Sequence, residues 1–63
     1  MSEFYTKLQE AVSEEQEDHD KYLKLAAEAN TEKEKKILLD IANEESIHKQ
    51  FLIQILKEAS GIN

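Results

Sequence analysis

The sequence contains no cysteine, no proline and a single glycine. Without cysteine the chain forms neither disulfides nor thiolate metal sites, so its stability and any metal binding must come from other groups. The lack of proline and the scarcity of glycine, together with many Glu, Lys, Leu and Ala residues, favour helix over strand. We therefore expect an all-α chain rather than a β-fold.

The chain is also short of positive charge and of long apolar runs. Eight Lys and Arg residues stand against fourteen Asp and Glu residues, which gives a formal net charge of −6. Nucleic acids and anionic membrane surfaces attract basic proteins, so this charge argues against both and favours cations as partners. No apolar run approaches the length of a membrane span, and residues 1–4 have no signal-peptide character. We expect a cytoplasmic protein, or one enclosed by something cytoplasmic.

Apolar periodicity predicts two helices joined by one turn. Apolar residues recur at helical spacing up to Ala29, which predicts a first helix over about residues 3–29. The segment Thr31-Glu32-Lys33-Glu34 has the form of a capping box and predicts a second helix over about residues 32–60. So short a connection forces the helices antiparallel. Residues 1–63 are thus expected to form one helical hairpin.

The second helix carries more apolar residues than a two-helix hairpin can cover. Besides its expected seam it has Ile37, Leu39, Ile47, Phe51, Ile53 and Leu56 on its flanks. A chain this short buries too little apolar surface to be stable alone without a disulfide, a bound metal or self-association. Two hairpins packed face to face are the simplest arrangement that hides these flanks. We expect an antiparallel two-helix hairpin that dimerises into a four-helix bundle, either as a homodimer or within a larger ring.

Charged residues interrupt both expected seams. Heptad positions of the first helix are Phe4, Leu8, Ala11, Glu15, Asp18, Tyr22, Leu25 and Ala29. Those of the second are Leu38, Ile41, Glu45, His48, Leu52, Ile55 and Ala59. Because the turn lies near residue 30, Glu15 precedes it by about as many residues as Glu45 follows it, so the interruptions should meet. Doubling the hairpin then combines a Glu from each of two helices with a Glu-x-x-His from each of the others, the ligand set of di-iron and di-manganese carboxylate bundles.

A metal explains these polar residues better than a bare polar core does. Buried carboxylates without compensation would protonate or open the bundle, and two divalent cations remove that penalty. Carboxylate oxygens with one imidazole per metal suit iron, manganese or, less specifically, zinc. The alternative is a polar layer that only sets the register of the helices.

Glu15 is followed seven residues later by Tyr22, and residues 41–48 read Ile-Ala-Asn-Glu-Glu-Ser-Ile-His. With these residues the chain resembles, from Glu15 to about Leu56, the rubrerythrin branch of the ferritin-like superfamily, which has an Ile-Ala-x-x-Glu-x-x-His pattern in this region. Complete members hold two such helix pairs in one chain. A single pair is similar to the encapsulated ferritins, half-sized ferroxidases that build their iron site between subunits and are cargo for encapsulin nanocompartments.

The resemblance implies roles for particular residues. Glu15, Glu45 and His48 would be metal ligands, with Glu45 and its symmetry mate bridging two irons per dimer and Tyr22 close to the site. Four further residues are candidates for additional or peripheral metal contacts: Glu14, Glu17, Asp18 and His19. These residues and Tyr22 also have plainer interpretations. Asp18 can reach water at the seam's edge, and His19 can be solvated. Glu14 and Glu17 can belong to a solvated acidic face, and Tyr22 can fill the core.

Three functions are consistent with this reading. The first is a di-iron ferroxidase that oxidises Fe(II) between subunits for iron storage or detoxification, inside an encapsulin shell if the resemblance extends that far. The second is rubrerythrin-like peroxide reduction with an external electron donor, because the chain has no four-cysteine rubredoxin module. The third is a helical dimerisation module without catalysis.

Overall fold

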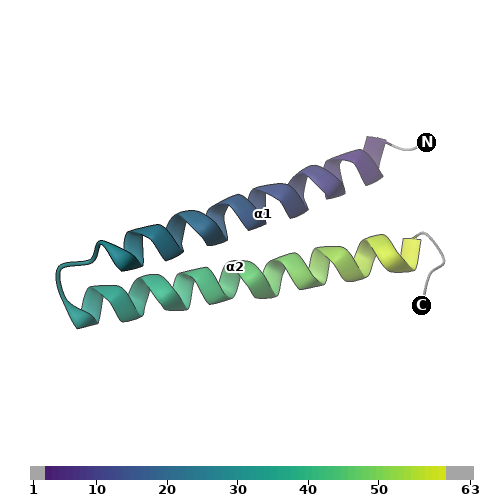
Figure 1. The fold of residues 1–63 in the computed structure, drawn as a ribbon. Helices are drawn as coiled ribbons and strands as arrows, with labels where there is room; N and C mark the ends of the chain where they lie inside the picture. The colour runs from purple at the N-terminus through teal and green to yellow at the C-terminus, as the bar shows by residue number, and fades with distance from the viewer. Residues whose placement is uncertain (1–2, 60–63) are drawn as a thin grey trace.

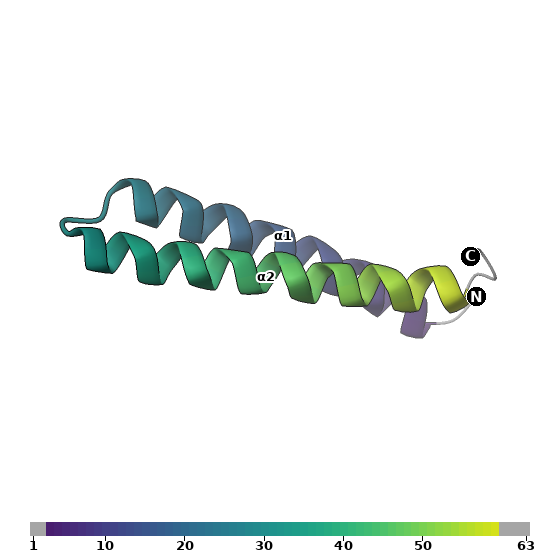
Figure 2. The ribbon, with the colours of Figure 1, turned by 90° about the horizontal axis from the view of Figure 1, so that it is seen from below.

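The computed structural model describes residues 3–59, which form two helices, α1 (Glu3–Ala27) and α2 (Glu32–Ala59). Figures 1 and 2 show the helices lying side by side and antiparallel, with the turn at one end of the molecule and the start of α1 and the end of α2 at the other. The molecule measures 47 × 20 × 11 Å. Its shortest dimension is about the diameter of one helix, so the hairpin is a single layer. The predicted all-α hairpin is confirmed.

The start of α2 is built by the predicted capping box. The amide of Glu34 donates to the hydroxyl oxygen of Thr31 at 3.1 Å. In return, the Glu34 carboxylate accepts from the amides of Thr31 at 3.2 Å and Asn30 at 3.1 Å. These bonds satisfy amides that have no partner within the helix, and they fix where the chain reverses.

The end of α1 differs slightly from the prediction. The helix ends at Ala27 rather than near residue 29. The amides of Glu28 and Ala29 bond to the carbonyls of Leu25 and Ala26, at 3.0 and 3.2 Å, so each bond spans three residues instead of four. This narrower winding is common where a helix gives way to a turn. The predicted end of the second helix near residue 60 lies outside the described residues.

The core within residues 3–59 is small. Three side chains there are buried, those of Leu8, Ala26 and Ala42. Two of them are alanines, which heptad counting did not place on the seam, and their small size allows the helices to approach closely. Several predicted seam residues are instead exposed in the single hairpin, among them Phe4, Leu25, Ile55 and Ala59. Two helices share one narrow contact line, so residues at its edges remain open to water.

Many large apolar side chains are therefore exposed to solvent. The exposed large apolar residues within the described part of the chain are Phe4, Leu23, Leu25, Ile37, Leu39, Ile47, Phe51 and Ile55. Soluble monomers rarely expose large contiguous apolar patches, and such patches mark interaction surfaces. Neither described helix combines the length and apolar character needed to cross a membrane.

Candidate metal centre

Glu15, Glu45 and His48 converge midway along the hairpin. His48 Nδ1 lies 3.3 Å from Glu15 Oε2 and 4.0 Å from Glu45 Oε1. One candidate ligand atom from each of the three residues lies within 4.8 Å of those of the other two. Within residues 3–59 this is the one such group of three or more potential ligands. The contacts join α1 to α2, because Glu15 comes from the first helix and the other two from the second.

The antiparallel turn explains why these residues meet. Glu15 lies 12 residues before Ala27, the end of α1, and Glu45 lies 13 residues after Glu32, the start of α2. At 1.5 Å per residue both are therefore about 18–20 Å from the turn. His48 follows Glu45 by three residues, so both project from one side of α2. The level of the site is thus set by the position of the capping box.

The two carboxylates share a confined space. The side chains of Glu15 and Glu45 are each 19% exposed, whereas that of His48 is 56% exposed. A hydrogen bond with Glu15 raises the pKa of Glu45 above its ordinary value of 4.5, and partial burial and the charges of Glu15 and Asp18 act in the same direction. His48 acts against this rise in the pKa. The chain therefore brings together two acids that repel each other when both are ionised, which a cation would relieve.

These donor atoms fit a divalent metal ion of the first transition row. Metal bonds to carboxylate oxygen and imidazole nitrogen are about 2.0–2.2 Å long, so two ligand atoms on one ion are at most about 4.4 Å apart. The separations of 3.3 and 4.0 Å fall inside this limit. A mixed oxygen and nitrogen donor set suits iron, manganese or zinc better than calcium or magnesium. One hairpin offers three donors, fewer than such an ion usually takes.

The other predicted acidic residues lie around this group rather than in it. Asp18 is half-buried one turn from Glu15, with a carboxylate oxygen 3.8 Å from the ammonium of Lys21. Its charge contributes to the raised pKa of Glu45. Glu14 and Glu17 are exposed on α1 and do not join the converging group.

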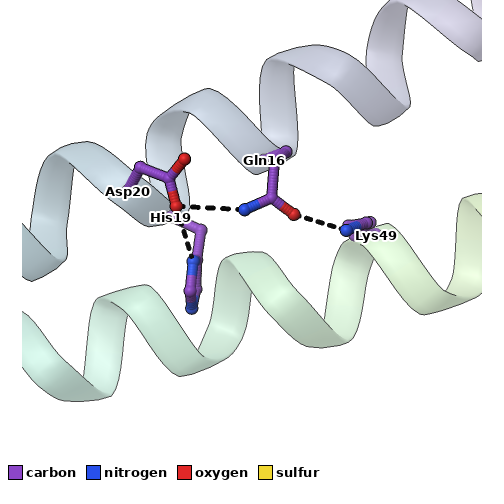
Figure 3. Close-up of polar contacts among 4 residues, drawn as sticks. All are labelled: Gln16, His19, Asp20 and Lys49. Carbon is purple, nitrogen blue, oxygen red and sulfur yellow. Dashed lines mark hydrogen bonds and ion pairs between the residues drawn. The ribbon is translucent and has the colours of Figure 1, made fainter.

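His19 and Tyr22 occupy half-buried positions. The side chain of His19 is 28% exposed, so it is partly covered and still meets water. Its Nδ1 lies 3.3 Å from Asp20 Oδ1, and in the view of Figure 3 the ring extends from α1 towards α2. The ammonium of Lys21 lies 5.0 Å from the centre of the Tyr22 ring. This contact places Tyr22 beside a cation, on the same helix as Glu15.

Sequence reasoning missed one contact between the helices. Lys49 of α2 donates a hydrogen bond to the side-chain oxygen of Gln16 on α1 (Figure 3). In the sequence, the i,i+4 spacing of Glu45 and Lys49 favours a pair along α2 instead. The signal that could have identified the actual partner is the position of Gln16 and Lys49 directly after the candidate ligands Glu15 and His48.

Comparison with known families fits this geometry. The family model described as Rubrerythrin matches residues 7–62, nearly the whole chain. The chain belongs to the rubrerythrin family. No curated protein and no solved structure matches it. Membership in the rubrerythrin family indicates a ferritin-like di-iron protein with iron-dependent oxidoreductase chemistry, and the matched segment includes Glu15, Glu45 and His48. The likeness to encapsulated ferritins, the encapsulin shell and the cytoplasmic location stay predictions.

Proposed function

We propose that this chain is a di-iron ferroxidase whose site is completed by a second copy of the hairpin. The observation that carries the proposal is the convergence of Glu15, Glu45 and His48 from two helices. One hairpin supplies one carboxylate and one Glu-x-x-His. Two hairpins supply four carboxylates and two imidazoles, the donor set of ferritin-like di-iron bundles.

The surface next to the triad supports a second copy as the partner. Four exposed apolar residues form what we call the apolar stripe of α2: Ile37, Ile47, Phe51 and Ile55. At about 100° per residue they fall within an arc of about 80°, and His48 lies about 20° beyond its edge. A partner that covers the stripe would therefore also cover the exposed edge of the site. A second hairpin brings both the apolar surface and the missing ligands.

The chemistry uses Fe(II) as substrate. Two Fe(II) ions give up two electrons, and dioxygen takes these electrons with two protons to form hydrogen peroxide. The chain contributes the carboxylates and imidazoles of Glu15, Glu45 and His48, which hold both oxidation states in a fixed geometry and favour the more highly charged product. Iron is the preferred metal by family, and manganese or zinc would occupy the same donors without this turnover.

Rubrerythrin-like peroxide reduction is the second candidate, because the chain belongs to the rubrerythrin family. In that reaction hydrogen peroxide takes two electrons and two protons and yields two molecules of water. These 63 residues contain no cysteine, so the electrons would come from a separate donor. Such an enzyme would turn over faster with peroxide and a reductant than with dioxygen.

Iron oxidation by the purified protein tests the proposal. Fe(II) added without oxygen, followed by air, should be oxidised faster than in buffer and saturate at about two irons per dimer. Glu45→Ala and His48→Ala should lower iron binding and return oxidation to the buffer rate. Glu10→Ala, which removes an exposed carboxylate from α1, should change neither.

A protein that binds no iron and does not accelerate its oxidation would be a dimerisation module, and the ferroxidase proposal would be wrong. The site assignment would also fail if Glu45→Ala oxidised iron at the wild-type rate while melting at a higher temperature. That result would mean that the polar layer serves only to set the register of the helices.

A further inference from the structure

A second polar cluster joins the helices beside the candidate metal centre. The Lys49 ammonium donates to Gln16 Oε1, and Gln16 Nε2 donates to Asp20 Oδ1 at 3.0 Å. His19 Nδ1 lies 3.3 Å from the same Asp20 oxygen (Figure 3). We call Gln16, Asp20 and Lys49 the seam clasp. It links α1 to α2 through side chains that are not candidate ligands.

The seam clasp lies at the level of the site and crosses the same contact between α1 and α2. Gln16 directly follows Glu15, and Lys49 directly follows His48, so each is turned about 100° around its helix from that residue, while Lys49 lies only about 40° around α2 from Glu45. Lys49 lies about 160° around α2 from Phe51, in the middle of the apolar stripe. A partner seated on the stripe would therefore leave the seam clasp intact. The clasp belongs to the single hairpin.

The contacts of the seam clasp fix the orientation of the Gln16 amide. Its oxygen faces the Lys49 ammonium and its nitrogen faces the Asp20 carboxylate, so a flipped amide would lose both bonds. Both bonds involve an ionised partner, and such bonds are roughly twice as strong as neutral ones. Gln16 and Lys49 are also half-buried, which reduces screening by salt. The amide thus connects a cation of α2 to an anion of α1.

We propose that the seam clasp is a positioning device that holds α1 and α2 in axial register at the metal centre before a metal ion binds. The inference rests on the proposed metal site. Glu15 and Glu45 repel each other when ionised, so the triad alone favours separation of the helices at this level. A slip by one residue moves a ligand by about 1.5 Å along the axis, far more than metal–ligand distances tolerate. The clasp opposes this slip through a hydrogen bond that joins α1 to α2 next to the triad.

Cobalt(II) binding tests the seam clasp without reliance on iron oxidation. Co(II) affinity and visible absorption spectrum would be measured by competition titration well below the unfolding temperature. Lys49→Met should weaken binding by about tenfold, since it removes one charge-assisted bond from the clasp, and should alter the spectrum. Lys49→Arg keeps a donor and a positive charge and should restore both. Lys36→Met, an exposed lysine of the same helix, is the matched control.

A second variant separates positioning from general stability. Gln16→Leu should weaken Co(II) binding as Lys49→Met does, and the double variant should be no weaker than either alone, because each removes the same link. If Lys49→Met or Gln16→Leu lowers the melting temperature but binds Co(II) with the affinity and spectrum of Lys36→Met, the clasp is only structural and the proposal is overturned. Additive losses would overturn it as well. Wild-type protein that binds no Co(II) would refute the metal centre itself, which is a distinguishable result.

Discussion

Truncation of Phe51 to Ala should weaken self-association strongly. Phe51 leaves 60% of its surface in water, the largest fraction in the apolar stripe. Full burial of such a side chain contributes roughly 1.5–3 kcal/mol, so covering this remainder contributes about 0.9–1.8 kcal/mol. In a two-fold dimer both copies lose it, a total of about 1.8–3.6 kcal/mol. The dimer dissociation constant should therefore rise roughly 20- to 400-fold.

Sedimentation equilibrium over a range of concentrations measures this change, and circular dichroism verifies that the helices persist. Leu39→Ala is the matched control, because Leu39 is also a large exposed apolar residue of α2, at 40%, but lies about 120° around the helix from Phe51. Equal dissociation constants for the two variants would show that the apolar stripe is not the dimer interface. A wild-type protein that stays monomeric at high concentration would refute the assembly altogether.

Three further predictions concern Glu45, the turn and Asp18. The raised pKa of Glu45 means that the folded, metal-free chain keeps a proton that the unfolded chain releases near pH 4.5. The protonated carboxyl therefore stabilises the folded chain fully below pH 4.5, and this stabilisation is lost as the pH rises through the pKa of Glu45 in the folded chain. Urea unfolding in chelator should show the loss, and Glu45→Gln should remove it. Thr31→Ala removes the hydroxyl that accepts a hydrogen bond from the Glu34 amide. It should lower the free energy of unfolding by about 1 kcal/mol, or Tm by about 4–8 °C in circular dichroism. Ser13→Ala, at an exposed position of α1, should change little. Asp18→Asn should leave the number of bound metal ions unchanged in metal analysis, because Asp18 lies outside the converging group, and should lower the pKa of Glu45.

The turn and the level of the site could be predicted because both depend on local chemistry and counting. The Thr31 to Glu34 spacing is that of a capping box, and it fixed the start of α2. Once the turn was placed, equal distances along antiparallel helices put Glu15 beside Glu45 and His48. The capping box and the hairpin are confirmed by the structure. The coordination of metal by these residues stays a prediction.

Which side chains are buried between the two helices could be predicted less accurately. Heptad counting assumes a fully enclosed seam, but one pair of helices encloses only a narrow line, so Ala26 and Ala42 are buried while Phe4 and Leu25 are exposed. The partner of Lys49 was also missed. An i,i+4 rule considers only residues on the same helix, whereas a half-buried lysine on the seam can reach a partner on the other one.

The small core has a consequence for how the chain behaves at different abundances. With Leu8, Ala26 and Ala42 as the buried side chains of its described part, the hairpin alone has a small core, and a partner that covers its remaining apolar surface would add to its stability. If that cover is another copy, the folded fraction rises with the amount of protein present. Scarce chains would then be open to proteolysis and abundant ones protected, so the supply of the protein would itself regulate how long each molecule survives.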